Sequence, residues 1–336
     1  MEKRRLGTEG PLVSQVGLGC MGMSDLYGPA DRNEAIETIR TALDAGITLL
    51  DTGDFYGMGH NELLIRDALV GYDRNDVQIS VKFGALRDSA GGWNGYDTRP
   101  VAIKNFLAYS LCRLGLDYVD IYRPSRLDPA VPIEETIEAI ADLVQAGYVR
   151  HIGLSEVGAE TIRRAAKVHP ICDLQIEYSL FSRGIEQEIL PICRELGISI
   201  MAYGVLSRGL LSGHWSNARV LGSDDFRSIS PRFRGENLKI NLELVERLRA
   251  IAHEVGASAA QIAIAWVGAQ GKDIIPLVGA RRRDQLMEAL GAMNFHLTQA
   301  QLDALAEAVP VGAAAGARYP EALLVHMDSE RSIRSQ

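Results

Sequence analysis

The sequence predicts a single (β/α)8 barrel domain over residues 1–336, with a C-terminal tail at about 311–336. Two observations predict this fold. Eight short apolar runs alternate with amphipathic helical segments, and no Pro- or Ser-rich linker divides them. The runs are also apolar along their length rather than alternating, which is typical of strands covered on both faces. A closed parallel barrel therefore fits the pattern better than two domains do.

The predicted strands share a short β-branched run. They are residues 13–19, 47–53, 77–84, 119–124, 149–156, 173–179, 198–204 and 274–280. Before the first of them, residues 5–12 contain a Gly-rich turn and predict a short hairpin that closes the bottom of the barrel. Two loops are longer than a connection requires, residues 85–99 and 206–240. Both follow strands, so in a barrel they lie at the C-terminal face, where functional loops gather.

The helices are predicted from apolar spacing and from their end signals. Residues 33–45 and 132–146 each carry an apolar stripe, and Asp31 with Glu34 has capping-box spacing ahead of the first. Two further capping boxes, Ser258 with Gln261 and Thr298 with Gln301, predict later helices. Five glycines stand where a left-handed residue ends a helix, namely Gly46, Gly71, Gly115, Gly147 and Gly197.

The amino-acid composition of the chain disfavours several classes of binding partner. A hydrophobic fraction of 47% with 23% charged residues indicates a folded chain, and a net charge of −8 disfavours a nucleic-acid partner. Four widely spaced cysteines predict neither disulfides nor a zinc knuckle. Residues 1–5 are not followed by an apolar stretch, and no apolar run is long enough to span a bilayer. We therefore expect a cytoplasmic protein without a membrane partner, and the oligomeric state stays open.

A glycine motif suggests a nucleotide-binding site of the Rossmann type but fails on its context. Gly17, Gly19 and Gly22 have the spacing G-x-G-x-x-G after a strand. That motif requires a helix to begin at once, so that its N-terminus meets the pyrophosphate. Here residues 23–32 intervene, and Asp51 comes too late to serve as the acidic partner. A Gly-rich first barrel loop is the preferred interpretation.

Three side chains suited to proton transfer follow neighbouring strands. Asp51 ends the second strand, Tyr56 follows in the loop, and Lys82 ends the third. Strand ends of a barrel converge on one face, so we expect these side chains to meet. An ammonium next to a phenol favours the phenolate and lowers its pKa, and a carboxylate keeps the ammonium charged. The trio is suited to protonating an oxygen while hydride reaches the adjacent carbon.

Each of the three residues also has an ordinary structural explanation. Asp51 would cap a turn, Tyr56 would be a core aromatic, and Lys82 would extend from its strand to solvent. The combination favours chemistry, because a lysine that ends the apolar run 77–81 is costly unless it is paired.

The sequence resembles the aldo-keto reductase family, in its bacterial and plant branch, from about Arg4 to Leu305. LDTGDFYG from Leu50, followed by Asn61 and Glu62, is similar to the family's active-site signature. SVKF from Ser80 is similar to its lysine strand and LDYVDIY from Leu116 to its fourth strand. IGLS from Ile152, LQIEYS from Leu174 and Ala202-Tyr203 continue the likeness in order.

The resemblance implies NADPH-dependent reduction of an aldehyde or ketone. Tyr56 would be the general acid, with Lys82 and Asp51 tuning it. Ser155 and Gln175 would bind the nicotinamide carboxamide, and Tyr203 would stack on the ring. Residues along the pyrophosphate and adenosine would be Gly204, Val205, Leu206, Ser207, Arg208, Gly209, Gly279, Arg281 and Gln285, and Gly19, Met21 and Asp51 would complete the cofactor site. Arg281 and Arg282, before a helix, favour a 2′-phosphate unless they form only a solvated basic cluster.

The sequence departs from the family at two positions. Ser125 stands where a catalytic histidine is expected, and Ala289 stands where an asparagine often contacts adenine. Serine is shorter than histidine and cannot carry charge, so Arg123 and Arg126 are candidate substitutes unless they face outward in ion pairs. Three outcomes are open. The enzyme reduces carbonyls normally with Tyr56 doing most of the work, it favours a substrate whose own polar group fills the vacated space, or it has lost efficient turnover.

Substrate contacts are expected from the long loops and from Tyr56 and Arg126. Trp93 and Tyr96, or Phe226 and Trp215, would form an aromatic wall unless they are local packing anchors. The rival function is an NADPH-binding regulatory subunit with little turnover, as in channel-associated members of the family. A metal-dependent barrel hydrolase is disfavoured because the histidines are scattered, so no metal site is expected.

Overall fold

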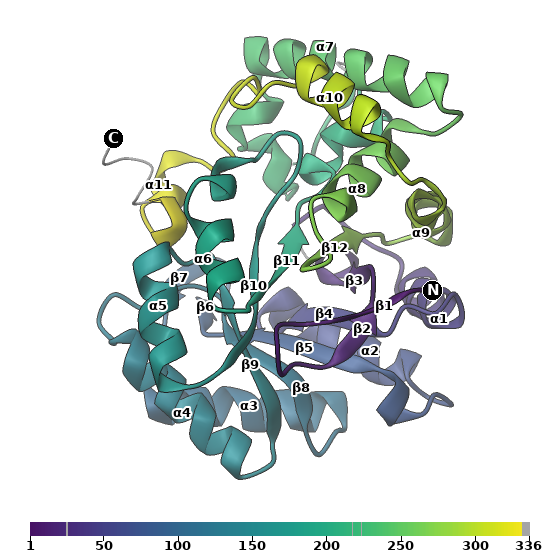
Figure 1. Cartoon of the computed structure of the whole chain (residues 1–336). Coiled ribbons are helices and arrows are strands. Elements are labelled where there is room, and N and C mark those ends of the chain that lie inside the picture. Colours follow the sequence, from purple (N-terminus) through teal and green to yellow (C-terminus); the bar gives the residue numbers. More distant parts are fainter. Residues whose placement is uncertain (25, 217, 223, 331–336) are drawn as a thin grey trace.

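The computed structural model describes residues 1–336 except 25, 217, 223 and 331–336 (Figure 1). Its centre is a closed barrel of eight parallel strands, which confirms the predicted fold class. In barrel order the strands are β3 (Gly17–Gly19), β4 (Leu49–Gly53), β5 (Gln78–Phe83), β8 (Val119–Pro124), β9 (Val149–Ser155), β10 (Ile171–Glu177), β11 (Ser199–Tyr203) and β12 (Ile274–Gly279). Each strand pairs with the next along the chain, and β12 closes on β3.

Helices cover the outside of the barrel. They are α1 (Arg32–Asp44), α2 (His60–Ala68), α3 (Pro100–Leu114), α4 (Ile133–Gln145), α5 (Ala159–Val168), α6 (Ile189–Glu195), α7 (Gly235–Glu254), α8 (Ala259–Ala269), α9 (Arg283–Leu290), α10 (Gln299–Ala308) and α11 (Glu321–Leu324). The helices α7 and α10 lie side by side at the top of Figure 1, and the short α11 lies near α5 and α6.

The helix-end signals act as the sequence predicts. Asp31 accepts a hydrogen bond from the backbone N–H of Glu34 at 2.8 Å at the start of α1. Ser258 and Thr298 each form a complete capping box at the start of α8 and α10. Such caps satisfy backbone donors that a helix start otherwise leaves unpaired, and each contributes about 1 kcal/mol.

The N-terminal hairpin closes one end of the barrel. Its second strand includes the start of the predicted first barrel strand, so that prediction is wrong in its bounds. Strand β1 (Lys3–Arg5) pairs with β2 (Leu12–Ser14), so residues 13–19 are not one strand but β2, a turn and β3. The Ser14 hydroxyl donates to the carbonyl of Val16 at 2.7 Å, which fixes that turn. Leu6 and Val13 pack inside the barrel in one cluster with residues of five of its strands.

The two long loops have internal structure. The first holds the hairpin β6 (Ala85–Arg87) and β7 (Trp93–Tyr96). The second ends earlier than predicted, because α7 begins at Gly235 rather than after residue 240. The predicted C-terminal tail packs on the barrel over its described residues. The chain after α10 crosses the barrel mouth and is described as far as Glu330. We call residues 315–330 the C-terminal segment.

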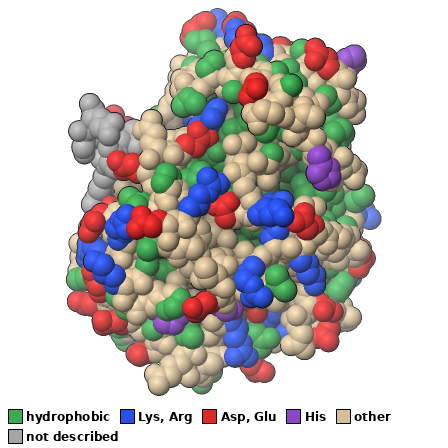
Figure 2. Space-filling view, viewed as in Figure 1, with side chains coloured by type: hydrophobic (Ala, Val, Ile, Leu, Met, Phe, Trp, Pro, Cys, Tyr) green, Lys and Arg blue, Asp and Glu red, His purple; other side chains and the backbone are tan. Residues whose placement is uncertain are grey.

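The outer surface mixes both signs of charge. Acidic and basic side chains are interspersed on the face shown in Figure 2, and many form ion pairs between helices, such as Arg163 with Glu195 at 2.7 Å. All four cysteines are unpaired. No helix of the described chain is by itself long and apolar enough to cross a membrane, although α7 and α8 together, bent by 87°, match on length and composition. The described residues contain no group of three His, Cys, Asp or Glu side chains placed to hold a metal.

Candidate active site

Asp51 and Lys82 meet at the barrel mouth as the strand register requires. Their strands are neighbours, with Asp51 opposite Ser80 and Gly53 opposite Lys82. The ammonium of Lys82 forms an ion pair with Asp51, and both side chains are buried. The Asp51 carboxylate also accepts hydrogen bonds from the Ser80 hydroxyl at 2.9 Å and the Gln175 amide at 2.7 Å. Three donors from two other strands therefore fix this carboxylate.

Tyr56 lies against this ion pair. The Lys82 ammonium is 5.1 Å from the centroid of the Tyr56 ring, and the ring of Phe55 packs edge-on at 4.8 Å. The turn that begins at Tyr56 contains three consecutive residues with positive φ, including Met58 at 54°. A left-handed backbone is unfavourable for a residue such as methionine, and such strain gathers at functional sites.

The pKa of Tyr56 departs from the expected direction. Burial raises it well above its usual value, and the charge of Asp51 raises it further. Burial also lowers the pKa of Lys82, although Asp51 opposes that change. The expected lowering of the Tyr56 pKa is therefore wrong for this state, because removal from water outweighs a lysine already paired with a carboxylate. Tyr56 is a neutral phenol at neutral pH.

Ser125 extends strand β8 toward the same site. Its backbone N–H donates to the carbonyl of Phe83 at 2.9 Å, which continues the β5–β8 ladder by one residue. The side chain is 3% exposed, and its hydroxyl has no hydrogen-bond partner among the described residues. A buried hydroxyl without a partner is unusual in a folded protein and indicates a place for a ligand or a water.

The two arginines that flank Ser125 differ in their surroundings. Arg123 points into the barrel, where its guanidinium donates to Asp173 at 2.9 Å, and both side chains are fully buried. Burial raises the pKa of Asp173 to about 6, although Arg123 opposes the rise. Arg123 is thus a buried structural partner, which removes it as a substitute for the missing histidine. Arg126 stays at the mouth and donates to the carbonyl of Ser125 at 2.6 Å.

The loops around the mouth concentrate backbone strain. Within the described residues, the non-glycine positions with positive φ are Leu26, Met58, Glu156, Ser207 and Arg208. All five follow barrel strands. Ser207, Arg208 and Gly209 are consecutive, with φ of 46°, 56° and 100°, and follow Gly204, buried Val205 and Leu206. The backbone N–H groups of Ser207 and Gly209 donate to the carbonyls of Gly204 and Leu206, which closes the turns of this loop. The expected contact of this loop with a pyrophosphate stays a prediction.

Other residues assigned to the cofactor also gather at the mouth. Ser155 and Gln175 are directly paired across β9 and β10. Gly19 pairs with Asp51, and Met21 packs on the aromatic cluster of Phe55 and Tyr56. The Gln175 amide, however, donates to Asp51, so here it orients the carboxylate.

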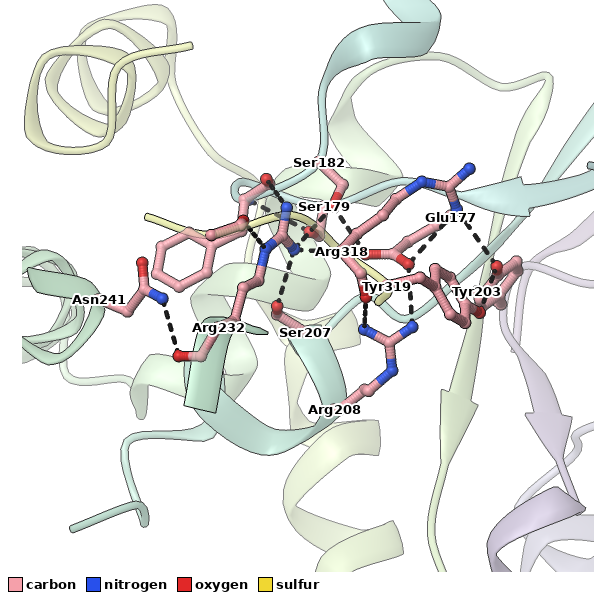
Figure 3. A network of polar contacts seen from close by, with 12 residues as sticks. Glu177, Ser179, Ser182, Tyr203, Ser207, Arg208, Arg232, Asn241, Arg318 and Tyr319 are labelled. Carbon is pink, nitrogen blue, oxygen red and sulfur yellow. Dashed lines mark hydrogen bonds and ion pairs between the residues drawn. The ribbon is translucent and has the colours of Figure 1, made fainter. Parts of the chain in front are cut away.

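A charged network, which the sequence did not predict, covers this side of the mouth (Figure 3). Arg318 pairs with Glu156, and Tyr203 donates to Glu156 at 2.7 Å and contacts the hydroxyl of Tyr319 at 2.9 Å. Arg208 contacts Glu177 at 3.4 Å and lies over the Tyr319 ring at 4.3 Å. Arg232, from the second long loop, joins Glu177 to Ser182 and Ser207. Tyr203 and Arg208, expected at the cofactor, are thus bonded to the C-terminal segment.

The residues expected to bind the adenosine half of the cofactor make contacts within the protein. Arg281 donates to the carbonyl of Tyr27 at 2.8 Å, and its own N–H donates to the Gln285 side chain at 3.3 Å. Arg282 pairs with Asp284 at 2.8 Å. A Cβ at Gly279 would meet nothing within 4 Å, so the end of β12 opens onto free space beside these residues. Arg281 and Gln285 contact each other, their expected role at the adenosine stays a prediction, and Asp284 neutralises Arg282.

The predicted aromatic wall is partly present. Trp93 is 47% exposed and lies 5.8 Å from Phe55, and Tyr96 packs on the cluster that contains Tyr56. Trp215 is buried against Phe233, and Phe226 lies 5.9 Å from Tyr319. Trp215 is therefore a packing anchor. Two surface hollows, of about 550 and 680 Å³, lie by α5 and by the N-terminal hairpin and include none of the residues around Tyr56.

Comparisons with known proteins agree with this architecture. The model of the Aldo/keto reductase family matches residues 15–310. The chain is 40% identical over 316 residues to a probable aldo-keto reductase 1 of Glycine max, covering 94% of this chain and 91% of that protein. A glycerol dehydrogenase from Gluconobacter oxydans superposes with a TM-score of 0.82 at 31% identity, covering 92% and 96% of the two chains. The holo form of an aldo-keto reductase from Bacillus halodurans does so at 0.75 and 30% identity, covering 93% and 97%. This chain belongs to the aldo/keto reductase family of nicotinamide-dependent oxidoreductases.

Proposed function

We propose that this protein reduces an aldehyde or ketone to an alcohol with NADPH, and that Tyr56 delivers the proton. Family membership implies carbonyl reduction with a nicotinamide cofactor. The cofactor would supply hydride, so the chain must supply a proton to the carbonyl oxygen. The observation that carries the proposal is the buried Asp51–Lys82 ion pair beside Tyr56.

The three residues have different roles in this proposal. Tyr56 keeps its proton at neutral pH because burial raises its pKa, so the phenol holds a proton that can be transferred. When the proton leaves, the Lys82 ammonium beside the ring stabilises the phenolate. Asp51 holds that ammonium in place, and Ser80 and Gln175 hold Asp51. Ser125, with its unpartnered hydroxyl, stands where a histidine is expected and leaves room beside the substrate for a further polar group.

The preference for NADPH is proposed from Arg281. Its guanidinium lies at the open end of β12 with backbone carbonyls as its recorded partners, so its charge is available to a 2′-phosphate. Arg282 and Arg283 contribute less, because Asp284 and Glu34 neutralise them. The strained loop from Ser207 to Gly209 supports a pyrophosphate site next to it. The unpaired cysteines support a reducing, cytoplasmic location.

Cofactor titration followed by a panel of carbonyl compounds tests the proposal. We expect NADPH to bind more tightly than NADH, and Arg281→Ala to remove most of that difference while Arg283→Ala preserves it. At least one activated aldehyde should sustain NADPH oxidation. Tight NADPH binding without turnover of any carbonyl would instead favour a cofactor-binding regulatory subunit. Equal affinity for NADH and NADPH would contradict the assignment of Arg281.

A further inference from the structure

We propose that the natural substrate carries a carboxylate as well as a carbonyl, and that Ser125 and Arg126 bind this carboxylate beside Tyr56. The inference rests on the reductase function proposed above and adds the substrate class. We call the Ser125 hydroxyl and the Arg126 guanidinium the carboxylate pocket.

Arg126 differs from the other cations at the barrel mouth. Apart from Arg281 at the end of β12, which contacts backbone carbonyls, the others have acidic partners: Lys82 has Asp51, Arg123 has Asp173, Arg208 and Arg232 share Glu177, and Arg318 has Glu156. Among the described residues, no carboxylate oxygen lies within 4.0 Å of the Arg126 guanidinium. Its recorded hydrogen bond, 2.6 Å long, runs from Nη1 to the carbonyl of Ser125. A guanidinium has five N–H donors, so most of them face no protein acceptor in this structure.

The positive charge of Arg126 influences the pKa of three tyrosines at the barrel mouth. Burial raises the pKa of Tyr56, Tyr96 and Tyr203, and the positive charge of Arg126 opposes that rise at all three. These tyrosines come from the loop after β4, the β6–β7 hairpin and the end of β11. The charge of Arg126 therefore acts on Tyr56, on the β6–β7 hairpin and on the end of β11.

Ser125 supplies a second, independent observation. Side chains alternate along a strand, and Arg123 points into the barrel, so Ser125 shares that inward face two residues later. The Ser125 hydroxyl is buried and has no hydrogen-bond partner in the described chain. An unpartnered hydroxyl and a cation without an acidic partner thus occupy consecutive positions beside Tyr56. Ser125 is buried and Arg126 is half-buried, and leaving a buried hydroxyl without a partner is costly unless a ligand or a water satisfies it.

The nearby acid does not fill this role. Glu156 lies within electrostatic reach of Arg126, but Arg318 and Ser329 bind its Oε2. Its Oε1 accepts from Arg318 at 2.9 Å and from Tyr203 at 2.7 Å. The planar fork of an arginine matches a carboxylate, and a serine hydroxyl adds one further donor. A single guanidinium with one hydroxyl suits the charge of a carboxylate.

Matched pairs of aldehydes test the inference. The substrates are 2-, 3- and 4-carboxybenzaldehyde and the methyl ester of each, which keep similar size and electron demand but differ in charge. A charge-assisted hydrogen bond is worth about tenfold or more in affinity. We expect wild-type kcat/KM to favour at least one acid over its ester by about tenfold, mainly through KM.

The variants locate the effect. Arg126→Gln should bring the acid-to-ester ratio to about one, Arg126→Lys should retain part of it, and Ser125→Ala should reduce it. The matched control is Arg99→Gln, which removes the same charge from an exposed arginine paired with Asp97 and should keep the wild-type ratio. Thermal unfolding of each variant checks that it is folded.

Two results would overturn the inference while leaving the reductase function intact. One is equal wild-type activity on acids and esters at all three ring positions. The other is an Arg126→Gln variant that loses kcat equally on acids and esters, which would make Arg126 a partner of the carbonyl itself. If wild type turned over none of the six aldehydes, the reductase proposal would fail separately. In that case, calorimetry with NADP+ present compares the affinities of 4-(hydroxymethyl)benzoate and its methyl ester for the protein. Tighter binding of the acid supports the carboxylate pocket, and equal binding rejects it.

Discussion

Tyr56 is the residue whose protonation state sets the direction of the proposed chemistry. Reduction uses the neutral phenol, and alcohol oxidation uses the phenolate. Because burial and Asp51 raise the pKa of Tyr56 well above its usual value, the phenol persists through neutral pH. We expect the rate of carbonyl reduction to stay nearly constant between about pH 6 and 8, and the rate of alcohol oxidation to rise toward alkaline pH. Initial rates in both directions across buffers of constant ionic strength measure this. A bell-shaped pH profile of the oxidation rate, centred on neutral pH, would contradict this expectation.

We expect Ser125 to limit the efficiency of the proposed reaction with simple substrates. Its hydroxyl is shorter than an imidazole and has no partner to orient it. Ser125→His should raise kcat/KM on simple aldehydes by about tenfold or more, because a donor aimed at the developing oxyanion is worth that much. Ser125→Ala, which removes the hydroxyl without adding a donor, is the control. Unchanged or lower activity in Ser125→His would show that the site is shaped for a different substrate.

The C-terminal segment is the element that joins the mouth to the end of the chain. Arg318 pairs with Glu156, and Asp328 accepts hydrogen bonds from the N–H of Gly158 and from Thr161. Burial alone would raise the pKa of Glu156, but Arg318 outweighs burial and holds that pKa well below its usual value. A carboxyl with a depressed pKa stabilises the folded form above its ordinary pKa, and this contribution is lost as the pH falls below about 4.

Arg318→Met should therefore release this segment, because it leaves Glu156 buried without its cation. Limited proteolysis at neutral pH should then cut between residues 310 and 330 faster than in wild type. Arg163→Met, which breaks the exposed pair with Glu195, should leave the cleavage rate unchanged. Equal cleavage of all three proteins would show that Arg318 does not hold the segment.

At the scale of the whole molecule, the Arg123–Asp173 pair joins β8 to β10 across the barrel interior. Both side chains are fully buried. Asp173→Ala leaves an unpaired buried cation, so we expect it to lower the free energy of unfolding by about 3–5 kcal/mol. The double variant Arg123→Met with Asp173→Leu should cost less than that single change, because no charge stays buried. Urea unfolding of the single and double variants provides the comparison. A double variant less stable than Asp173→Ala would show that the pair itself is strongly stabilising.

Much of the barrel could be predicted from the sequence, because its signals are local. The run at 47–53 and the box from Ser258 to Gln261 mark elements that the structure also has. The prediction of the first strand was wrong because valines stand on both sides of the turn after Ser14, so the pattern of residues 13–19 indicates one strand. The pairing of Asp51 with Lys82 was predictable, since adjacent parallel strands place their ends together.

The rest depends on contacts between distant segments. Nothing in local spacing connects Arg318 with Glu156, which lie 162 residues apart. The inward direction of Arg123 needed knowledge of its partner on β10. The raised pKa of Tyr56 follows from burial, which a sequence alone does not give.

The most direct test of the account is single-turnover reduction of an activated aldehyde by the NADPH complex of Tyr56→Phe. The account predicts a rate about 10²–10⁴-fold below wild type, because the proton donor is lost, with NADPH affinity within about twofold. Tyr148→Phe removes a hydroxyl from an exposed tyrosine and should behave as wild type. A Tyr56→Phe enzyme that turned over at the wild-type rate would contradict the central claim that Tyr56 delivers the proton.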